Sequence, residues 1–288
     1  METAVLSVAI GNYPHTRLLK ERLASSKDFD FVEVSPIAKA FAQMVRQGSY
    51  DISEMALVTF LQAKAFGKPL VLIPAAVAAR SQEVSLIRLA NNDGIKGPAD
   101  LKGKRIGVRA YSQTTGAWVR GILAENFGIA PESVHWTTFE DPHVAEYSDP
   151  PFATRAKPGS VLLEMLRAGE LDAVIVGNDK PTDADLADVY PDAEAAGRQF
   201  ASKHGFVPVN HVIVAKQSVV DTQRDALMTF WNAVKAAWKD CPSSKDLPIG
   251  RKAIEPSVAL ALQYISAQSM LPRPMTEADV WAGLPDGF

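Results

Sequence analysis

The chain has 288 residues, enough for one large or two medium-sized domains with a substantial core. Hydrophobic residues make up 47% of it and charged residues 22%, which excludes extensive disorder, collagen and coiled coil. The formal net charge of -3 provides no basic field, so nucleic acid is not expected as a partner. The single cysteine, Cys241, cannot form an intrachain disulfide or a thiolate zinc cluster.

The start of the chain bears on where the protein works. Residues 4–10 are apolar but few, and no basic leader precedes them, so they predict a strand rather than a signal peptide. No apolar run approaches the ~20 residues that span a bilayer, and no membrane partner is expected. We therefore expect a cytoplasmic protein, or a periplasmic one if an export signal has been removed. The sequence leaves open whether the protein is a monomer or a homo-oligomer.

Apolar runs alternate with helical patterns along the chain, which predicts an α/β protein. The expected strands, in chain order, are 5–10, 31–34, 70–74, 85–89, 105–109, 134–138, 172–177 and 208–215. The expected helices are 36–47, 54–66, 115–126, 161–168, 221–239 and 256–270. The Pro- and Asp-rich stretch 141–158 predicts a loop.

Two segments far apart in the sequence resemble each other. Residues 44–51, Met-Val-Arg-Gln-Gly-Ser-Tyr-Asp, match residues 165–172, Met-Leu-Arg-Ala-Gly-Glu-Leu-Asp. Each predicts a helix end, a glycine stop and an aspartate that opens a strand. The repeat predicts two lobes of related architecture, with 141–158 as an insertion in the second lobe. The alternative is that any two α/β units share such punctuation.

Two α/β lobes predict a central ligand cleft, because open α/β sheets bind ligands at the carboxyl ends of their strands. One lobe would contribute the segment Tyr13-Pro-His15-Thr16 together with Ser53 and Glu54. The other would contribute the loop 109–115 and Asn178. These residues are the candidates for binding and chemistry.

The loop 109–115, Arg-Ala-Tyr-Ser-Gln-Thr-Thr, joins a predicted strand to a predicted helix. Free N–H groups and the helix dipole at such a junction attract anions, and Arg109 could clamp a carboxylate. The alternative is ordinary capping by Ser112 or Thr114 with Arg109 in solvent. Hydroxyl groups exceed what one cap needs, so we favour anion binding.

Three titratable residues are candidates for acid–base chemistry. His211 lies in an apolar strand, where it is either a general acid or a hydrogen-bonded core residue. His15 is the next candidate, and Glu54 is equally well explained as a favourable charge in a first helical turn behind the cap Ser53. No local metal-binding spacing occurs, although a dispersed site from His15, Glu54 and His211 stays open. Motifs for dinucleotides, nucleotide hydrolysis and serine hydrolases are absent.

Several motifs together resemble a known family. Residues 97–107, Gly-Pro-Ala-Asp-Leu-Lys-Gly-Lys-Arg-Ile-Gly, are similar to the entry into the second lobe of type II periplasmic-binding-protein-like chains. Four further stretches resemble the 4,5-dihydroxyphthalate decarboxylase family, and the similarity extends over nearly the whole chain. The stretches are Ser-Val-Ala-Ile-Gly-Asn-Tyr-Pro-His (7–15), Tyr-Asp-Ile-Ser-Glu-Met (50–55), Tyr-Ser-Gln-Thr-Thr-Gly-Ala-Trp (111–118) and His-Gly-Phe-Val-Pro-Val-Asn-His (204–211).

The resemblance implies a two-lobed α/β type II binding-protein fold and non-oxidative loss of CO2 from a hydroxylated aromatic carboxylate, without an organic cofactor. It marks as matching positions His15, Ser53, Glu54, Gln113 and His211. This chain departs from the family pattern in two places. It has Arg-Ser-Gln-Glu at 80–83 where members show Arg-His-Ser, and Arg109-Ala110 where they show Pro-Glu.

We accordingly expect one lobe from residues 1–92 plus 206–288 and another from 93–205. The leading hypothesis is a phthalate-type decarboxylase. His211 would donate the proton, Glu54 or His15 would hold the phenol, and Arg109, Arg80, Thr114 and Thr115 would hold carboxylates. The runner-up is a non-catalytic solute-binding protein for a small organic anion. A third hypothesis is another enzyme of this fold, a dehydratase of the futalosine menaquinone route or a thiamine-precursor synthase.

Overall fold

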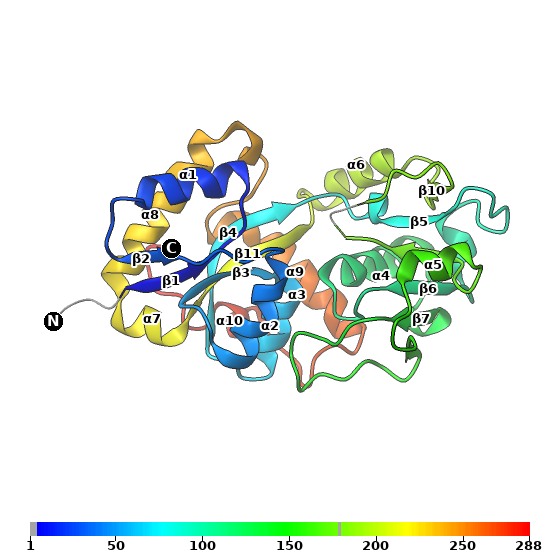
Figure 1. The fold of residues 1–288 in the computed structure, drawn as a ribbon, viewed down its shortest axis with the longest axis horizontal. Coiled ribbons are helices and arrows are strands. Elements are labelled where there is room, and N and C mark those ends of the chain that lie inside the picture. The colour runs from blue at the N-terminus through cyan, green and yellow to red at the C-terminus, as the bar shows by residue number, and fades with distance from the viewer. Residues whose placement is uncertain (1–4, 178–179) are drawn as a thin grey trace. The chain divides into compact units, whose positions relative to one another are not determined.

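A computed structural model describes residues 5–177 and 180–288, and the chain forms two compact units (Figure 1). The first unit contains the chain up to Ala79, together with Val209–Ala259 and Leu271–Phe288. The second contains Arg80–Pro208 and Leu260–Met270. Among the described helices, none combines the length and apolar character needed to cross a bilayer.

The first unit is built on a five-stranded sheet of order β2-β1-β3-β11-β4. Its strands are β1 (Leu6–Ala9), β2 (Phe29–Phe31), β3 (Ile52–Ala56), β4 (Leu70–Ala79) and β11 (Val209–Lys216). β1 runs parallel to β2 and β3, whereas β11 lies antiparallel between β3 and β4. The late strand β11 therefore occupies the middle of a sheet whose other strands all come from the first 79 residues.

Helices cover this sheet on both faces (Figure 1). They are α1 (Pro14–Leu23), α2 (Ala38–Gln47), α3 (Leu57–Ala65), α7 (Gln217–Thr222), α8 (Arg224–Asp240) and α10 (Glu277–Trp281). One face packs Val8, Ile52 and Ile213 against α1 and α8. Because side chains alternate along a strand, every second residue of β3 and β11 points toward those two helices.

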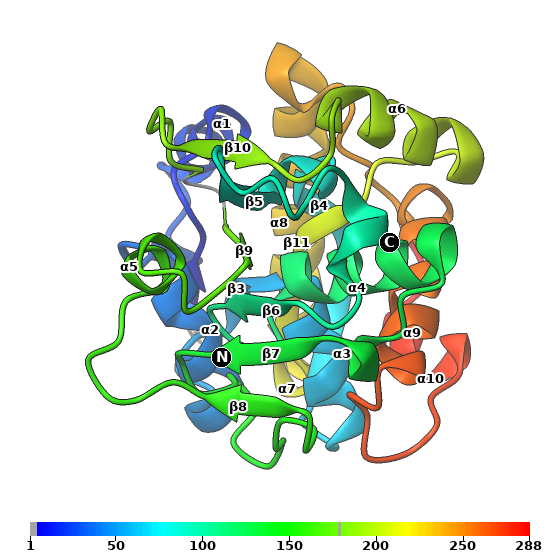
Figure 2. The same cartoon turned by 90° about the vertical axis from the view of Figure 1, so that its right-hand side faces the viewer.

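The second unit is built on a six-stranded sheet of order β10-β5-β9-β6-β7-β8 (Figure 2). Its strands are β5 (Leu86–Leu89), β6 (Arg105–Val108), β7 (His135–Thr138), β8 (Ala153–Arg155), β9 (Ala173–Ile175) and β10 (Leu186–Asp188). Its helices are α4 (Thr114–Phe127), α5 (Leu162–Arg167) and α6 (Ala193–His204), and α9 (Arg251–Ala267) is shared between the two units. α5 buries Leu166 against Ile87 and Val174 of the sheet.

The repeated punctuation of the two units is confirmed. Gly48 and Gly169 end α2 and α5 with φ of 61° and 71°, which favours glycine. The aspartates that follow do the same job in each unit. Asp51 Oδ2 accepts the N–H of Ser7 at 3.0 Å, and Asp172 Oδ2 accepts the N–H of Arg105 at 2.8 Å. Each carboxylate thus joins its own strand to the start of a neighbouring strand.

The unit boundaries differ from the predicted ones in two respects. Residues 80–92 belong to the second unit, because β5 pairs with β9 and β10 of that unit. Residues 260–270 also belong there, although we placed the whole of 206–288 in the first lobe. The reason is packing along α4: Gln268 Nε2 donates to the carbonyl of Ala117, and the Tyr264 hydroxyl donates to Glu125.

Two predicted helices also begin at other residues. The helix expected at 54–66 begins at Leu57, because residues 52–56 pair as β3 with β11. The helix expected at 256–270 begins at Arg251 and contains Pro256 inside it. Part of the loop expected at 141–158 forms the short strand β8. In each case, packing against the rest of the unit sets where the helix or strand begins, and the local capping and turn residues do not.

Candidate functional site

Glu54 and His211 are brought together by the pairing of β3 with β11. His211 lies opposite Ala56, and Ile213 lies opposite Glu54. Opposite residues share a face, and residues two apart along a strand share a face, so Glu54 and His211 are diagonal neighbours on one side of the sheet. His211 Nδ1 lies 2.7 Å from Glu54 Oε1 across 157 residues of sequence.

The Glu54 carboxylate is fully buried and accepts three hydrogen bonds. Oε1 accepts the Tyr13 hydroxyl at 2.9 Å as well as His211, and Oε2 accepts the N–H of Gly11 at 2.9 Å. A buried carboxylate is tolerated when donors meet its oxygens in this way. The three contacts use both oxygens, so the role of Glu54 is to hold Gly11, Tyr13 and His211 in place.

The location of Ser53 and Glu54 corrects the sequence interpretation. Neither lies at a helix start, because both belong to β3 and the residue before α3 is Ala56. Ser53 is fully buried, and its hydroxyl donates to the carbonyl of Glu54 at 2.7 Å. The helix-dipole explanation of Glu54 therefore does not apply, and Ser53 supports the strand locally.

His15 lies beside this pair, in the first turn of α1. Its side chain is 5% exposed, and its Nε2 has no hydrogen-bond partner within the described residues. Burial lowers the pKa of His15, outweighing a hydrogen bond with the backbone of Val77 and the charge of Glu54. The ring stacks on Tyr13 with centroids 5.5 Å apart and meets Trp238 edge-on at 4.4 Å. His15 is thus a neutral imidazole with one unused nitrogen.

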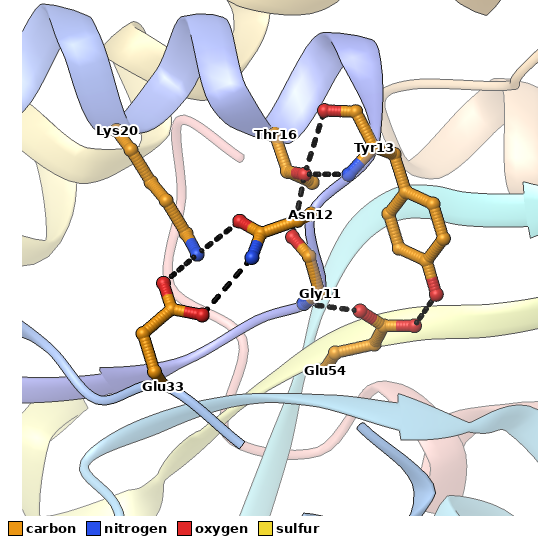
Figure 3. A network of polar contacts seen from close by, with 7 residues as sticks. All are labelled: Gly11, Asn12, Tyr13, Thr16, Lys20, Glu33 and Glu54. Carbon is orange, nitrogen blue, oxygen red and sulfur yellow. Dashed lines mark hydrogen bonds and ion pairs between the residues drawn. The ribbon is translucent and has the colours of Figure 1, made fainter. Parts of the chain in front are cut away.

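The loop before α1 is held firmly around these side chains (Figure 3). The N–H of Tyr13 donates to the Thr16 hydroxyl at 2.8 Å, and that hydroxyl donates to the carbonyl of Gly11 at 2.6 Å. A side chain at Gly11 would meet the Tyr13 ring at 2.8 Å and Glu54 Oε2 at 3.1 Å. Glycine at position 11 therefore allows the close approach that lets its N–H reach Glu54.

The geometry assigns a chemical state to His211. The ionised Glu54 can only accept, so Nδ1 of His211 carries the hydrogen and Nε2 becomes the nitrogen left for chemistry. The side chain is 15% exposed, which leaves it within reach of a bound molecule. The Phe41 ring meets the imidazole edge-on at 5.2 Å and restrains it from the α2 side. Such a pair can deliver or remove one proton.

No group of three or more His, Cys, Asp or Glu side chains in the described ranges could hold a metal ion. The open possibility of a metal held by His15, Glu54 and His211 therefore finds no support in this arrangement.

In the second unit, the start of α4 carries the predicted anion-binding groups. Thr114 and Thr115 are buried in its first turn, and Gln113 precedes it. Arg80 Nη2 donates to the Thr115 hydroxyl at 2.9 Å, so this guanidinium lies at the helix start. The buried Gln113 Oε1 has no partner in the described chain. A cation, hydroxyls and helix N–H groups together suit a carboxylate.

Two other predicted members of this group are placed differently. Arg109 is 39% exposed and pairs with Glu140 at 3.5 Å, so its charge is already shared with a surface carboxylate. Asn178 lies outside the described residues. The guanidinium at the start of α4 is therefore that of Arg80, the arginine that directly precedes the departure from the family pattern at Ser81.

Sequence reasoning placed Tyr13 in the lining of the cleft but gave it no role, and it missed Arg120. Arg120 is 1% exposed in α4, and its Nη2 donates to the carbonyl of Tyr111 at 2.5 Å. Its signal was available, because Arg120 is the only charged residue between Arg109 and Glu125.

The two-sheet architecture is the type II periplasmic-binding-protein fold, and solved structures share it. The alkanesulfonate-binding protein SsuA from Xanthomonas axonopodis pv. citri, bound to MOPS, matches with a TM-score of 0.55 at 15% identity, over 98% of this chain and 91% of that one. The model of a family described as NMT1/THI5 like matches residues 31–148. The fold class expected from the sequence is therefore confirmed.

Curated relatives narrow this class. A 4,5-dihydroxyphthalate decarboxylase from Comamonas testosteroni is 26% identical over 98% of this chain and 87% of its own length. One from Pseudomonas putida is 33% identical over 59% of this chain and 69% of its own length. The chain belongs to the 4,5-dihydroxyphthalate decarboxylase family.

Proposed function

We propose that this protein is a non-oxidative decarboxylase of a hydroxylated, phthalate-like aromatic carboxylate. The observation that carries the proposal is the contact between His211 and the buried, triply hydrogen-bonded Glu54. Because Glu54 occupies Nδ1, a protonated His211 presents its Nε2 hydrogen, and such a reaction requires a proton donor. Membership of the decarboxylase family supports the reaction class.

The chemistry explains why a proton donor is needed. Direct loss of CO2 from an aromatic ring would leave an aryl anion in the ring plane, which the π system cannot stabilise. Protonating the carboxylate-bearing carbon first avoids that anion, provided a phenolate oxygen on the ring supplies the electron pair. The C–C bond then breaks, CO2 leaves, and its bonding electrons restore the aromatic ring. The net change is replacement of one carboxylate by hydrogen, at the cost of one proton.

Each residue of the first unit has a role in this scheme. The protonated His211 gives its Nε2 hydrogen to the ring carbon and becomes a neutral imidazole. Glu54 fixes the ring orientation and tautomer, and stabilises the charged form between turnovers. His15 is kept neutral by burial, so its unused Nε2 can accept the phenol hydrogen. Of the two phenol partners considered from sequence, His15 suits the role better because the Glu54 oxygens are occupied.

Within the second unit, Arg80 and the first turn of α4 are proposed to bind a carboxylate group. The Arg80–Thr115 hydrogen bond presents a guanidinium beside the first turn of a 14-residue helix, where the helix dipole favours an anion. This group needs no chemistry of its own. It therefore equally favours a second candidate function, a solute-binding protein for a small organic anion.

Replacing His211 by Asn separates the two candidates. In a decarboxylase, His211→Asn should lower the rate of CO2 release by about 10²–10⁴-fold and leave substrate affinity nearly unchanged. The measurement is CO2 release from hydroxylated phthalates and benzoates, with affinity by calorimetry. His135→Asn, at an exposed position of β7, is the matched control. Tight anion binding without turnover by the parent protein would favour the solute-binding function, and a fully active His211→Asn protein would remove His211 from the mechanism.

A further inference from the structure

We propose that Tyr13 is a positioning residue that sets the proton-donating strength of His211 through the carboxylate oxygen they share. The inference rests on the proposed function and deepens it. Its basis is geometric: the Tyr13 hydroxyl at 2.9 Å and His211 Nδ1 at 2.7 Å meet the same atom, Oε1 of Glu54.

Tyr13 is held in place independently of Glu54. Its N–H is bound by the Thr16 hydroxyl, and its ring stacks on His15 at an interplanar angle of 8°. The ring also covers Gly11 so closely that a methyl group there would clash with it. The phenol is therefore presented to Glu54 by the fold of the loop, and the hydrogen bond does not depend on a flexible side chain.

Sharing one oxygen has an electrostatic consequence. A donated hydrogen bond withdraws charge from a carboxylate, which weakens the attraction between that carboxylate and a second donor. Tyr13 therefore makes Glu54 a poorer stabiliser of protonated His211. A less stabilised imidazolium gives up its hydrogen more readily. That property matters here because the acceptor, an aromatic ring carbon, is a weak base.

The groups that face His211 are few, so the effect of Tyr13 can be isolated. From β3 the charged neighbour is Glu54, and from the α1 region the titratable neighbours are Tyr13 and His15. From α2 the neighbour is the apolar Phe41, and the β4 residues opposite His211 are alanines. Within this group, Glu54 is the residue bonded to both Tyr13 and His211.

The test replaces the hydroxyl and follows the imidazole directly. In Tyr13→Phe, the midpoint of the His211 titration by NMR should rise by about 0.5–1 pH unit. The midpoint of the alkaline limb in the pH profile of kcat should shift upward by the same number of pH units. The plateau value of kcat should fall by about 3–10-fold, with KM unchanged. Tyr50→Phe is the matched control, because it removes the hydroxyl that bonds Gln43 in the same unit. It should change neither readout.

A second variant gives the opposite sign and does not depend on Tyr13→Phe folding well. Fluorotyrosine incorporated at position 13 is a stronger hydrogen-bond donor of nearly the same size, and it should lower the His211 midpoint. An unchanged midpoint in both folded variants would overturn the proposal. If no substrate is turned over, the proposed function fails. The NMR midpoints still decide whether Tyr13 acts on His211.

Discussion

A charged side chain is almost completely buried in each unit, Glu54 in the first and Arg120 in the second, and the two are held in opposite ways. Glu54 in the first unit is met by three donors that together use both its oxygens. Arg120 in the second unit is held by Gln268 Oε1 at 2.7 Å and the carbonyl of Tyr111, and lies 3.8 Å from the centre of the Tyr111 ring. Its Nη1 has no partner in the described chain.

The surroundings of Arg120 contain further unused polar atoms. The hydroxyls of Tyr111 and Tyr147 and the Oδ1 of Asp149 are buried without a protein partner in the described residues. All three interact electrostatically with Arg120. Burial lowers the pKa of Arg120 and raises that of Asp149. Arg120 holds the loop that leads into α4 through the Tyr111 carbonyl.

The difference teaches what each buried charge is for. A carboxylate whose donors are complete fixes its neighbours and leaves one reactive nitrogen, His211 Nε2, without a bond to Glu54. A guanidinium held by an aromatic ring and neutral acceptors supports a backbone segment. Its Nη1 donor is left for water to bind. Buried polar atoms rarely lack partners altogether, so ordered water is expected around Arg120. The first centre is suited to chemistry and the second to support.

The largest effect is expected at Glu54. Glu54→Ala should lower the free energy of unfolding by about 3–5 kcal/mol, because it strips the acceptor from three buried donors at once. Urea unfolding followed by circular dichroism measures this. Glu33→Ala is the control, since Glu33 is an exposed carboxylate just after β2 that bonds Lys20 and Asn12. A loss below about 1 kcal/mol at Glu54 would contradict the importance given to this centre.

A smaller effect is expected near Arg120, where the sign of the change in Tm on replacing Tyr147 shows whether water is present. If ordered water satisfies the Tyr147 hydroxyl, Tyr147→Phe should lower Tm by about 2–4 °C. If that hydroxyl is unsatisfied in a dry interior, removing it should raise Tm instead. Differential scanning calorimetry distinguishes the two signs. A rise in Tm would show that Arg120 lies in a dry pocket and would sharpen the contrast with Glu54.

The smallest effect concerns His15 and pH. Its folded-state pKa is lowered below the ordinary 6.5, so the unfolded chain takes up a proton first as the pH falls. His15 therefore contributes stability that is fully present above pH 6.5 and is lost as the pH falls toward the folded-state pKa. The Tm difference between the parent and His15→Gln should shrink between about pH 7 and pH 5. A constant difference would show that the pKa of His15 is the same in the folded and the unfolded chain.

Much of the candidate site could be selected from sequence, because its residues fall in recognisable motifs. His15, Glu54 and His211 lie in three of the stretches that resemble the decarboxylase family. Arg80 was also selected, though as a helper of Arg109. The structure reverses that order, because Arg109 is drawn to Glu140 whereas Arg80 bonds Thr115. Sequence spacing cannot distinguish two arginines whose directions depend on the neighbours they meet.

The sequence by itself determined the α/β class, the two related units and the glycine stops at Gly48 and Gly169. These features depend on local periodicity and backbone conformation, which a short window of residues contains. Only the tertiary structure decided that β11 enters the first sheet beside β3, that Glu54 lies in a strand, and that Tyr13 and His211 share its carboxylate. Those outcomes depend on strand register across 157 residues, which is set by burial of Ile52 and Ile213 on a common face.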